Sequence, residues 1–112
     1  MDNAIYGSAK AWVNFTGSSG SINGSYNVSS ITRNNTGYYT INMTNAMPNT
    51  NYAVNVTVST NGSVAPYSFL YCDTVASNTL ISPTTSSFVF CVSNSGQSVR
   101  YDPSYCMVSV FR

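Results

Sequence analysis

"AKAWVNF", residues 9–15, contains the alternation that decides the fold. In a β-strand, successive side chains point to opposite faces. One face of this stretch would carry Ala9, Ala11, Val13 and Phe15, and the other Lys10, Trp12 and Asn14. A two-layered domain needs only one apolar face, yet the only tryptophan of the chain is on the other one. Two interpretations follow: Trp12 is covered by a loop of its own chain, or Trp12 lies in or beside a subunit interface.

The same period of two continues along the chain, in residues 25–31, 38–43, 52–59, 67–72, 87–93 and 104–111. In three of these segments the alternation predicts apolar residues on one shared face of a strand. The three sets are Tyr26 with Val28; Tyr39 with Ile41 and Met43; and Tyr52 with Val54, Val56 and Val58. The Asn- and Gly-containing turn 33–37 predicts a hairpin between 27–32 and 38–43. No stretch has the spacing of an amphipathic helix. We therefore predict an all-β fold, an antiparallel β-sandwich or barrel-like domain of roughly seven to eight strands.

Length and composition fit one small domain with few charges. The chain has 112 residues, of which 43% are hydrophobic and 6% charged, and its net charge is +1. We expect an N-terminal extension over residues 1–8 and a single all-β domain over 9–112. A net charge this small gives no electrostatic footprint for nucleic acid, so no such partner is expected. Membrane insertion is not expected either, because the sequence contains no apolar span or leader.

The missing residue types argue against catalysis. The chain has no histidine and no glutamate, and its only carboxylate side chains are Asp2, Asp73 and Asp102. Ser-His-Asp and Cys-His catalysis and histidine-ligated zinc are therefore excluded. A glycosidase would need Asp73 paired with Asp102, and nothing in the sequence brings them together. We predict a non-enzyme without catalytic residues, cofactor or metal.

Three cysteines, Cys72, Cys91 and Cys106, each lie within an apolar run. An odd count is unlike a secreted disulfide framework, and buried free cysteine behaves as a small hydrophobic residue. We expect three reduced, poorly accessible thiols made in a reducing cytoplasm. One disulfide with a spare thiol is the alternative.

Five blocks together suggest a family: "KAWVNF" (10–15), "SYNVSSIT" (25–32), "TGYYTINM" (36–43), "AMPNTNYAV" (46–54) and "DPSYCMVSVF" (102–111). In this order they resemble the small domain at or near the C-terminus of many bacteriophage tail fibre proteins. Residues 60–101 have no counterpart in this resemblance. The resemblance implies a homotrimeric, non-enzymatic virion structural protein, made in the bacterial host cytoplasm and exposed on the particle. If the chain is complete, another virion protein of the tail or capsid must anchor it.

The expected function is adhesion to the host cell surface, in which several weak contacts act together. The partner would be a surface glycan or protein. Loops rich in Tyr, Ser, Asn and Gly suit such contacts, and the candidate receptor contacts are Tyr67, Arg100, Tyr101 and Tyr105. Two alternatives are a capsid decoration, cement or head-fibre protein with no receptor role, and a carbohydrate-binding module of a cellular protein.

The trimer has a physical argument beside the resemblance. Val89 and Cys91 oppose Phe88, Phe90 and Val92 within one predicted strand, and residues 69–72 are apolar on both faces in the same way. Large exposed apolar surfaces favour association, and the low net charge does not oppose it. We expect Trp12 at the subunit interface.

Overall fold

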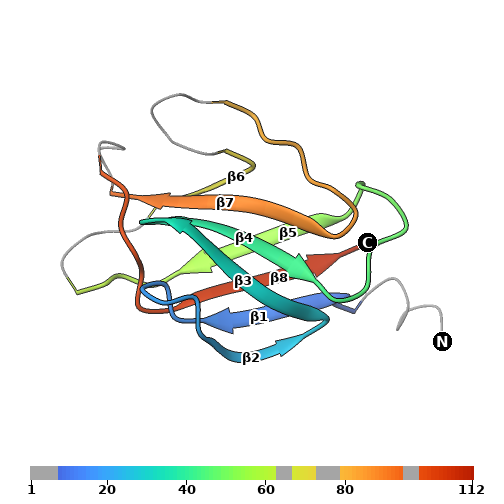
Figure 1. Cartoon of the computed structure of the whole chain (residues 1–112), viewed down its shortest axis with the longest axis horizontal. Helices are drawn as coiled ribbons and strands as arrows, with labels where there is room; N and C mark the ends of the chain where they lie inside the picture. Colours follow the sequence, from blue (N-terminus) through green and yellow to red (C-terminus); the bar gives the residue numbers. More distant parts are fainter. Residues whose placement is uncertain (1–7, 63–66, 73–78, 95–98) are drawn as a thin grey trace.

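The computed structural model is an all-β sandwich of two four-stranded antiparallel sheets (Figure 1). It describes residues 8–62, 67–72, 79–94 and 99–112, and in these ranges it contains eight strands and no helix. The strands are β1 (Ala11–Phe15), β2 (Ile22–Tyr26), β3 (Val28–Asn35), β4 (Tyr38–Met43), β5 (Ala53–Val58), β6 (Tyr67–Leu70), β7 (Ser87–Ser93) and β8 (Cys106–Phe111). Sheet A has the order β2-β1-β8-β5, and sheet B has the order β3-β4-β7-β6. The predicted fold class is confirmed; of the expected extension 1–8, residues 1–7 lie outside the described ranges.

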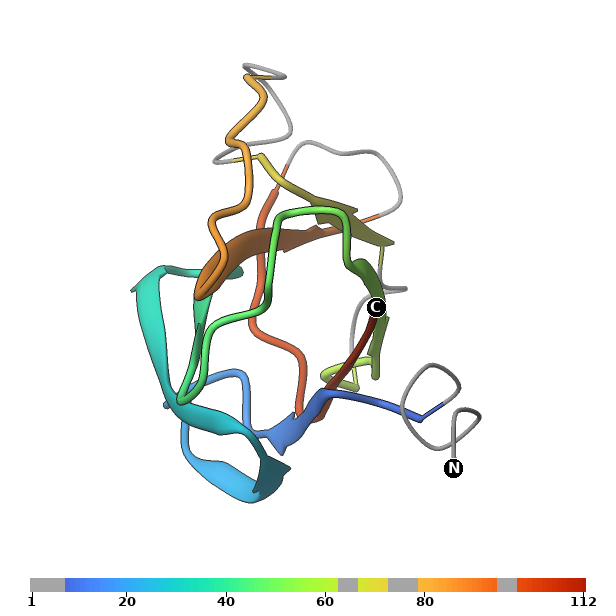
Figure 2. The same cartoon turned by 90° about the vertical axis from the view of Figure 1, so that its right-hand side faces the viewer.

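The view along the strands shows the two sheets facing each other (Figure 2). One hydrophobic core lies between them. Its centre is a cluster of three aromatic rings from Phe15, Tyr39 and Phe90, all fully buried. The ring centroids of Phe15 and Tyr39 are 5.2 Å apart, and those of Tyr39 and Phe90 are 5.3 Å apart. Aromatic pairs at this separation add stability beyond the area that they bury. The cluster therefore joins β1 of sheet A to β4 and β7 of sheet B.

The predicted inward faces are confirmed for most strands. Ala11, Val13 and Phe15 of β1 are buried while Trp12 faces outward, and β4 alternates in the same way. The predicted hairpin is also present, with Ile31 paired to Ile41 in the β3–β4 ladder.

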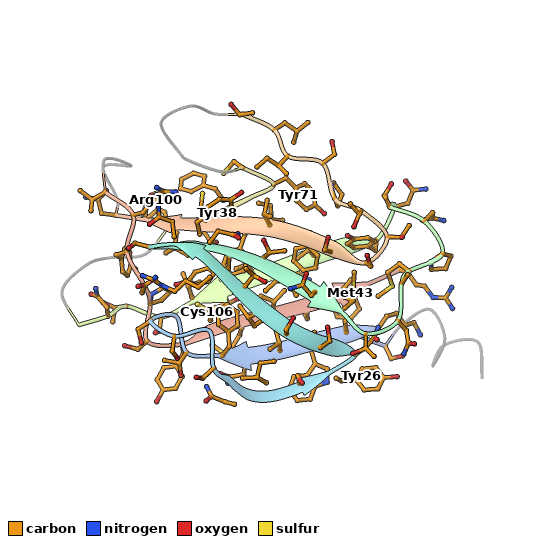
Figure 3. The ribbon with its side chains drawn as sticks, viewed as in Figure 1. Tyr26, Tyr38, Met43, Tyr71, Arg100 and Cys106 are labelled. Carbon is orange, nitrogen blue, oxygen red and sulfur yellow. The ribbon has the colours of Figure 1, made fainter. Side chains whose placement is uncertain are left out.

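The prediction that Tyr26 and Val28 share a face is wrong. Between them the chain passes from sheet A to sheet B at Asn27, whose backbone is left-handed with φ 56°. The Asn27 side chain fixes this corner, because its Nδ2 donates to the carbonyl oxygens of Lys10 and Asn45 and its Oδ1 accepts from the Asn45 N–H. Val28 is consequently buried, whereas Tyr26 is exposed and projects from the edge of the sandwich (Figure 3).

A hydrogen-bonded corner around Asp102 joins the two sheets near the start of β8. The Asp102 carboxylate accepts hydrogen bonds from the Arg33 guanidinium (2.7 Å), the Gly37 N–H (2.9 Å) and the Tyr39 hydroxyl (2.7 Å). The Tyr39 hydroxyl also lies 2.9 Å from the Gly17 carbonyl oxygen. Burial disfavours the charged form of Asp102, but these hydrogen bonds outweigh it, so the pKa of Asp102 is lowered. We call Gly17, Arg33, Gly37, Tyr39 and Asp102 the Asp102 corner.

The second apolar face of β7 is covered by the same chain. Val89 is 9% exposed and Cys91 is fully buried, although both point away from the core between the sheets. The chain that leaves β6 lies beside them, since the Tyr71 N–H donates to the Val89 carbonyl oxygen and Cys72 Sγ contacts Cys91 Sγ. The two-sided pattern of this strand thus reflects packing within one chain. The pattern of β7 is therefore no argument for a trimer, contrary to the expectation from the sequence.

Candidate functional site

The outer face of sheet A is the surface on which Trp12 lies. The strand registers place its outward residues in two rows, Tyr26–Trp12–Ser109–Asn55 and Gly24–Asn14–Met107–Thr57, each running across β2, β1, β8 and β5. The registers follow from the inward apolar residues, because a shift by one residue would turn every buried side chain outward.

A shallow groove of about 330 Å³ runs over this face. The outward side chains that line it are Trp12, Asn14, Asn55, Thr57, Met107 and Ser109. We call it the Trp12 groove. Its volume is within the range of small-ligand sites, and its lining contains an aromatic ring, a thioether, two amides and two hydroxyls. No ionisable side chain from the described parts of the chain lines it.

Trp12 is 43% exposed, so no part of the described chain buries it. The interpretation that a loop of its own chain covers Trp12 is therefore not supported by the described residues. The indole instead lies toward β2: a Cβ added at Gly24 would be 3.6 Å from Cζ3 and Cη2 of the ring. Because glycine has no side chain, nothing at this position projects beside the indole ring. Trp12 thus presents a flat, accessible aromatic platform.

The polar groups of the groove are available for a ligand. Asn14 Oδ1 accepts a hydrogen bond from Asn23 Nδ2 at 3.2 Å, which orients that amide. Within the ranges that the structure describes, the side chains of Asn55, Thr57 and Ser109 make no hydrogen bond. Each amide offers two donor hydrogens and an acceptor oxygen, and each hydroxyl can both donate and accept.

The four predicted receptor contacts do not form one site. Tyr67 is 48% exposed, and Tyr67 and Arg100 both pair with Ser93 at one end of β7 in sheet B. Tyr105 is 55% exposed and directly precedes β8 of sheet A, where its carbonyl oxygen accepts from the Ser59 N–H. Arg100 is half-buried.

Tyr101 has to be corrected as a receptor contact. Its side chain is only 6% exposed and belongs to the core cluster, so it cannot serve as a surface platform. The reason is that its backbone N–H donates to the Val92 carbonyl oxygen, which draws this segment onto the end of β7.

Sequence reasoning singled out Trp12, as a candidate subunit-interface residue, but not the other residues of the groove. Asn55 and Thr57 occupy the outward positions of β5, and Met107 and Ser109 occupy those of β8. Their alternation with buried valines was the available signal, because it marks them as facing away from the core. It did not show that β8 and β5 lie beside β1.

The comparisons with family models, curated proteins and solved structures found no match to this chain. Among the described residues, none forms a helix that could cross a membrane. Those residues also contain no cluster of three or more His, Cys, Asp or Glu side chains that could hold a metal ion.

Proposed function

We propose that this chain is a non-enzymatic virion protein of the bacteriophage tail-fibre type, which binds a neutral saccharide of the host cell surface through the Trp12 groove. The observation that carries the proposal is the chemistry of that groove: an exposed indole beside amides and hydroxyls, without a charge. The sequence resemblance supports the same class, since its blocks contribute β1, β3, β4 and β8 of the sandwich. The protein would be made in the host cytoplasm and carried on the particle.

The groove matches a sugar ring in two respects. A pyranose has an apolar face of C–H groups, which would lie against the Trp12 indole and remove both surfaces from water. Its hydroxyl groups both donate and accept hydrogen bonds, as do the side chains of Asn55 and Ser109. A charged ligand would find no opposite charge in the lining.

A permanent subunit interface fits this face less well. Such interfaces are more apolar than the general surface and resemble a divided core. Of the six outward side chains that line the Trp12 groove, four carry an amide or a hydroxyl group. These amides and hydroxyls would each need a partner in a second subunit. We therefore assign the groove to a ligand rather than to a neighbouring subunit.

The direct test is a titration with neutral oligosaccharides prepared from bacterial cell surfaces. Because Trp12 is the only tryptophan, its fluorescence reports on the groove, and we expect its emission to change on binding. In calorimetric titrations, Trp12→Ala should weaken the affinity by about tenfold or more, a loss of ~1.4 kcal/mol. The matched control is Tyr67→Ala, which removes a similarly exposed aromatic ring from sheet B, outside the groove; an equal loss of affinity in this variant would return the binding site to the sequence-based candidate Tyr67. Absence of binding to saccharides and cells alike would favour the decoration-protein alternative.

The trimer is a separate part of the proposal, taken from the resemblance. Light scattering of the native protein should give three times the 12.0 kDa mass of one chain. Trp12→Ala should keep that mass, because the groove is assigned to saccharide. If the wild type is a trimer and the Trp12→Ala variant is a monomer, then Trp12 is a subunit contact and the assignment of the groove to a saccharide is wrong. A folded wild-type monomer would contradict the trimer alone.

A further inference from the structure

Two cysteines that are distant in sequence meet on the outer face of sheet B. The Sγ atoms of Cys72 and Cys91 are 3.0 Å apart, and both residues are present as thiols. Cys91 lies on β7, and its partner in the ladder is Phe69 of β6. The contact is therefore set by the β6–β7 register together with the path of the chain after β6.

The path after β6 is a sharp turn at Tyr71. This residue has a left-handed backbone with φ 60°, which is uncommon for a residue other than glycine. The turn returns Cys72 toward its own strand, so that Cys72 Sγ lies 3.8 Å from the Phe69 carbonyl oxygen. Backbone hydrogen bonds from Tyr71 N–H to Val89 and from Ile81 N–H to Tyr71 fix this arrangement. The two thiols are thus held together by the backbone.

The three thiols of the chain differ in accessibility. Cys72 is half-buried and lines an open hollow of about 350 Å³ with Thr79 and Leu80, which admits a small molecule. Cys91 is fully buried directly behind it. Cys106 is enclosed between the sheets, where burial, aided by the charge of Asp102, raises its pKa to about 12 (Figure 3). Because the thiolate is the reactive form, the raised pKa and full burial of Cys106 keep its thiol unreactive at neutral pH. The expectation of three poorly accessible thiols is thus confirmed for Cys91 and Cys106, which are buried, whereas Cys72 is half-buried.

We propose that Cys72 and Cys91 are a disulfide-forming pair, which a small-molecule disulfide such as glutathione disulfide oxidises. The Cys72 thiolate attacks one sulfur of glutathione disulfide, a mixed disulfide forms, and one glutathione thiolate leaves. Cys91 then attacks Cys72 Sγ, its proton passes to solvent, and the second glutathione leaves as thiolate and is protonated. Two protein thiols are oxidised and one glutathione disulfide is reduced to two glutathione molecules. This inference does not depend on the proposed function.

The bond would tie the segment after β6 to β7. A cross-link between Cys72 and Cys91 closes a chain segment and so restricts the unfolded state. We expect the oxidised protein to have a Tm higher by roughly 10 °C, a shift that a reducing agent reverses.

The experiment is oxidation of the native wild type with glutathione disulfide, followed by denaturation, thiol titration and peptide mapping by mass spectrometry. The thiol count should fall from the three of the reduced chain to one, and the mapped disulfide should join Cys72 to Cys91. Cys106→Ser should behave like the wild type. Cys91→Ser should stop at a glutathione adduct on Cys72.

Three results would overturn the proposal. They are a wild type that retains all its thiols, a wild type that stops at the glutathione adduct, and a disulfide that involves Cys106 or a second molecule. The mapping uses the unmodified wild type, so it stands even if a serine variant fails to fold.

Discussion

Replacing Gly37 with alanine should lower the free energy of unfolding by about 3 kcal/mol. Gly37 has φ +62°, a left-handed conformation that costs other residues about 1 kcal/mol or more. The space is also closed: an added Cβ would lie 2.6 Å from the Val92 carbonyl oxygen and 2.7 Å from that of Tyr101. Both neighbours are backbone atoms and cannot rotate away. The methyl group must therefore separate the β3–β4 turn from β7 and from the segment before β8.

Gly62→Ala is the matched control for this substitution. Gly62 also has a positive φ, +97°, but no atom of the described residues lies within 4 Å of an added Cβ. Its substitution should cost only the backbone strain, about 1 kcal/mol. Urea unfolding of both variants measures the difference. Equal losses at the two positions would show that the contacts of Gly37 with Val92 and Tyr101 do not carry the effect.

The sequence was sufficient to predict the fold class and the inward faces of most strands. In β1 and β4, every second residue is apolar, and these residues are the buried ones. The reason is general: a sheet with one buried face imposes a period of two on its sequence. The outward position of Trp12 follows from the same rule, and it was predicted correctly.

The sequence-based predictions for Tyr26 and Tyr101 were wrong because long-range packing overrides the local pattern at both residues. Tyr26 and Val28 have strand alternation, but the left-handed Asn27 between them moves the chain to the other sheet. Tyr101 lies in a segment of turn-like composition, yet it is drawn into the core by its hydrogen bond to Val92. Composition describes the local backbone, and it does not show which distant element covers a side chain.

The groove needed the strand order as well as the strand pattern. Asn55, Thr57 and Met107 are ordinary outward residues when each strand is considered alone. They become walls of a site with Trp12 only because sheet A has the order β2-β1-β8-β5. That order joins segments from both ends of the chain. No short-range signal in the sequence specifies it.

Asp102→Asn should lower the free energy of unfolding at neutral pH by about 2–3 kcal/mol, because the corner loses charge-assisted hydrogen bonds. Asparagine is similar in size, but its neutral oxygen accepts more weakly from Gly37 and Tyr39, and it gives Arg33 no opposite charge. The Tyr39 hydroxyl is the sensitive partner, since its residue is fully buried among the core rings. Asp73→Asn is the control for removal of one negative charge.

The pH dependence gives an independent test of the same carboxylate. The folded pKa of Asp102 is lowered, so its stabilisation is complete above the ordinary aspartate pKa of about 3.9. That stabilisation is lost as the pH falls through the lowered folded-state pKa, because a proton binds more tightly to Asp102 in the unfolded chain than in the folded one. The gap between wild type and Asp102→Asn in urea unfolding should therefore be wide at about pH 7 and should narrow below about pH 4. A gap that stays constant down to strong acid would mean that Asp102 stabilises the corner by its shape rather than by its charge.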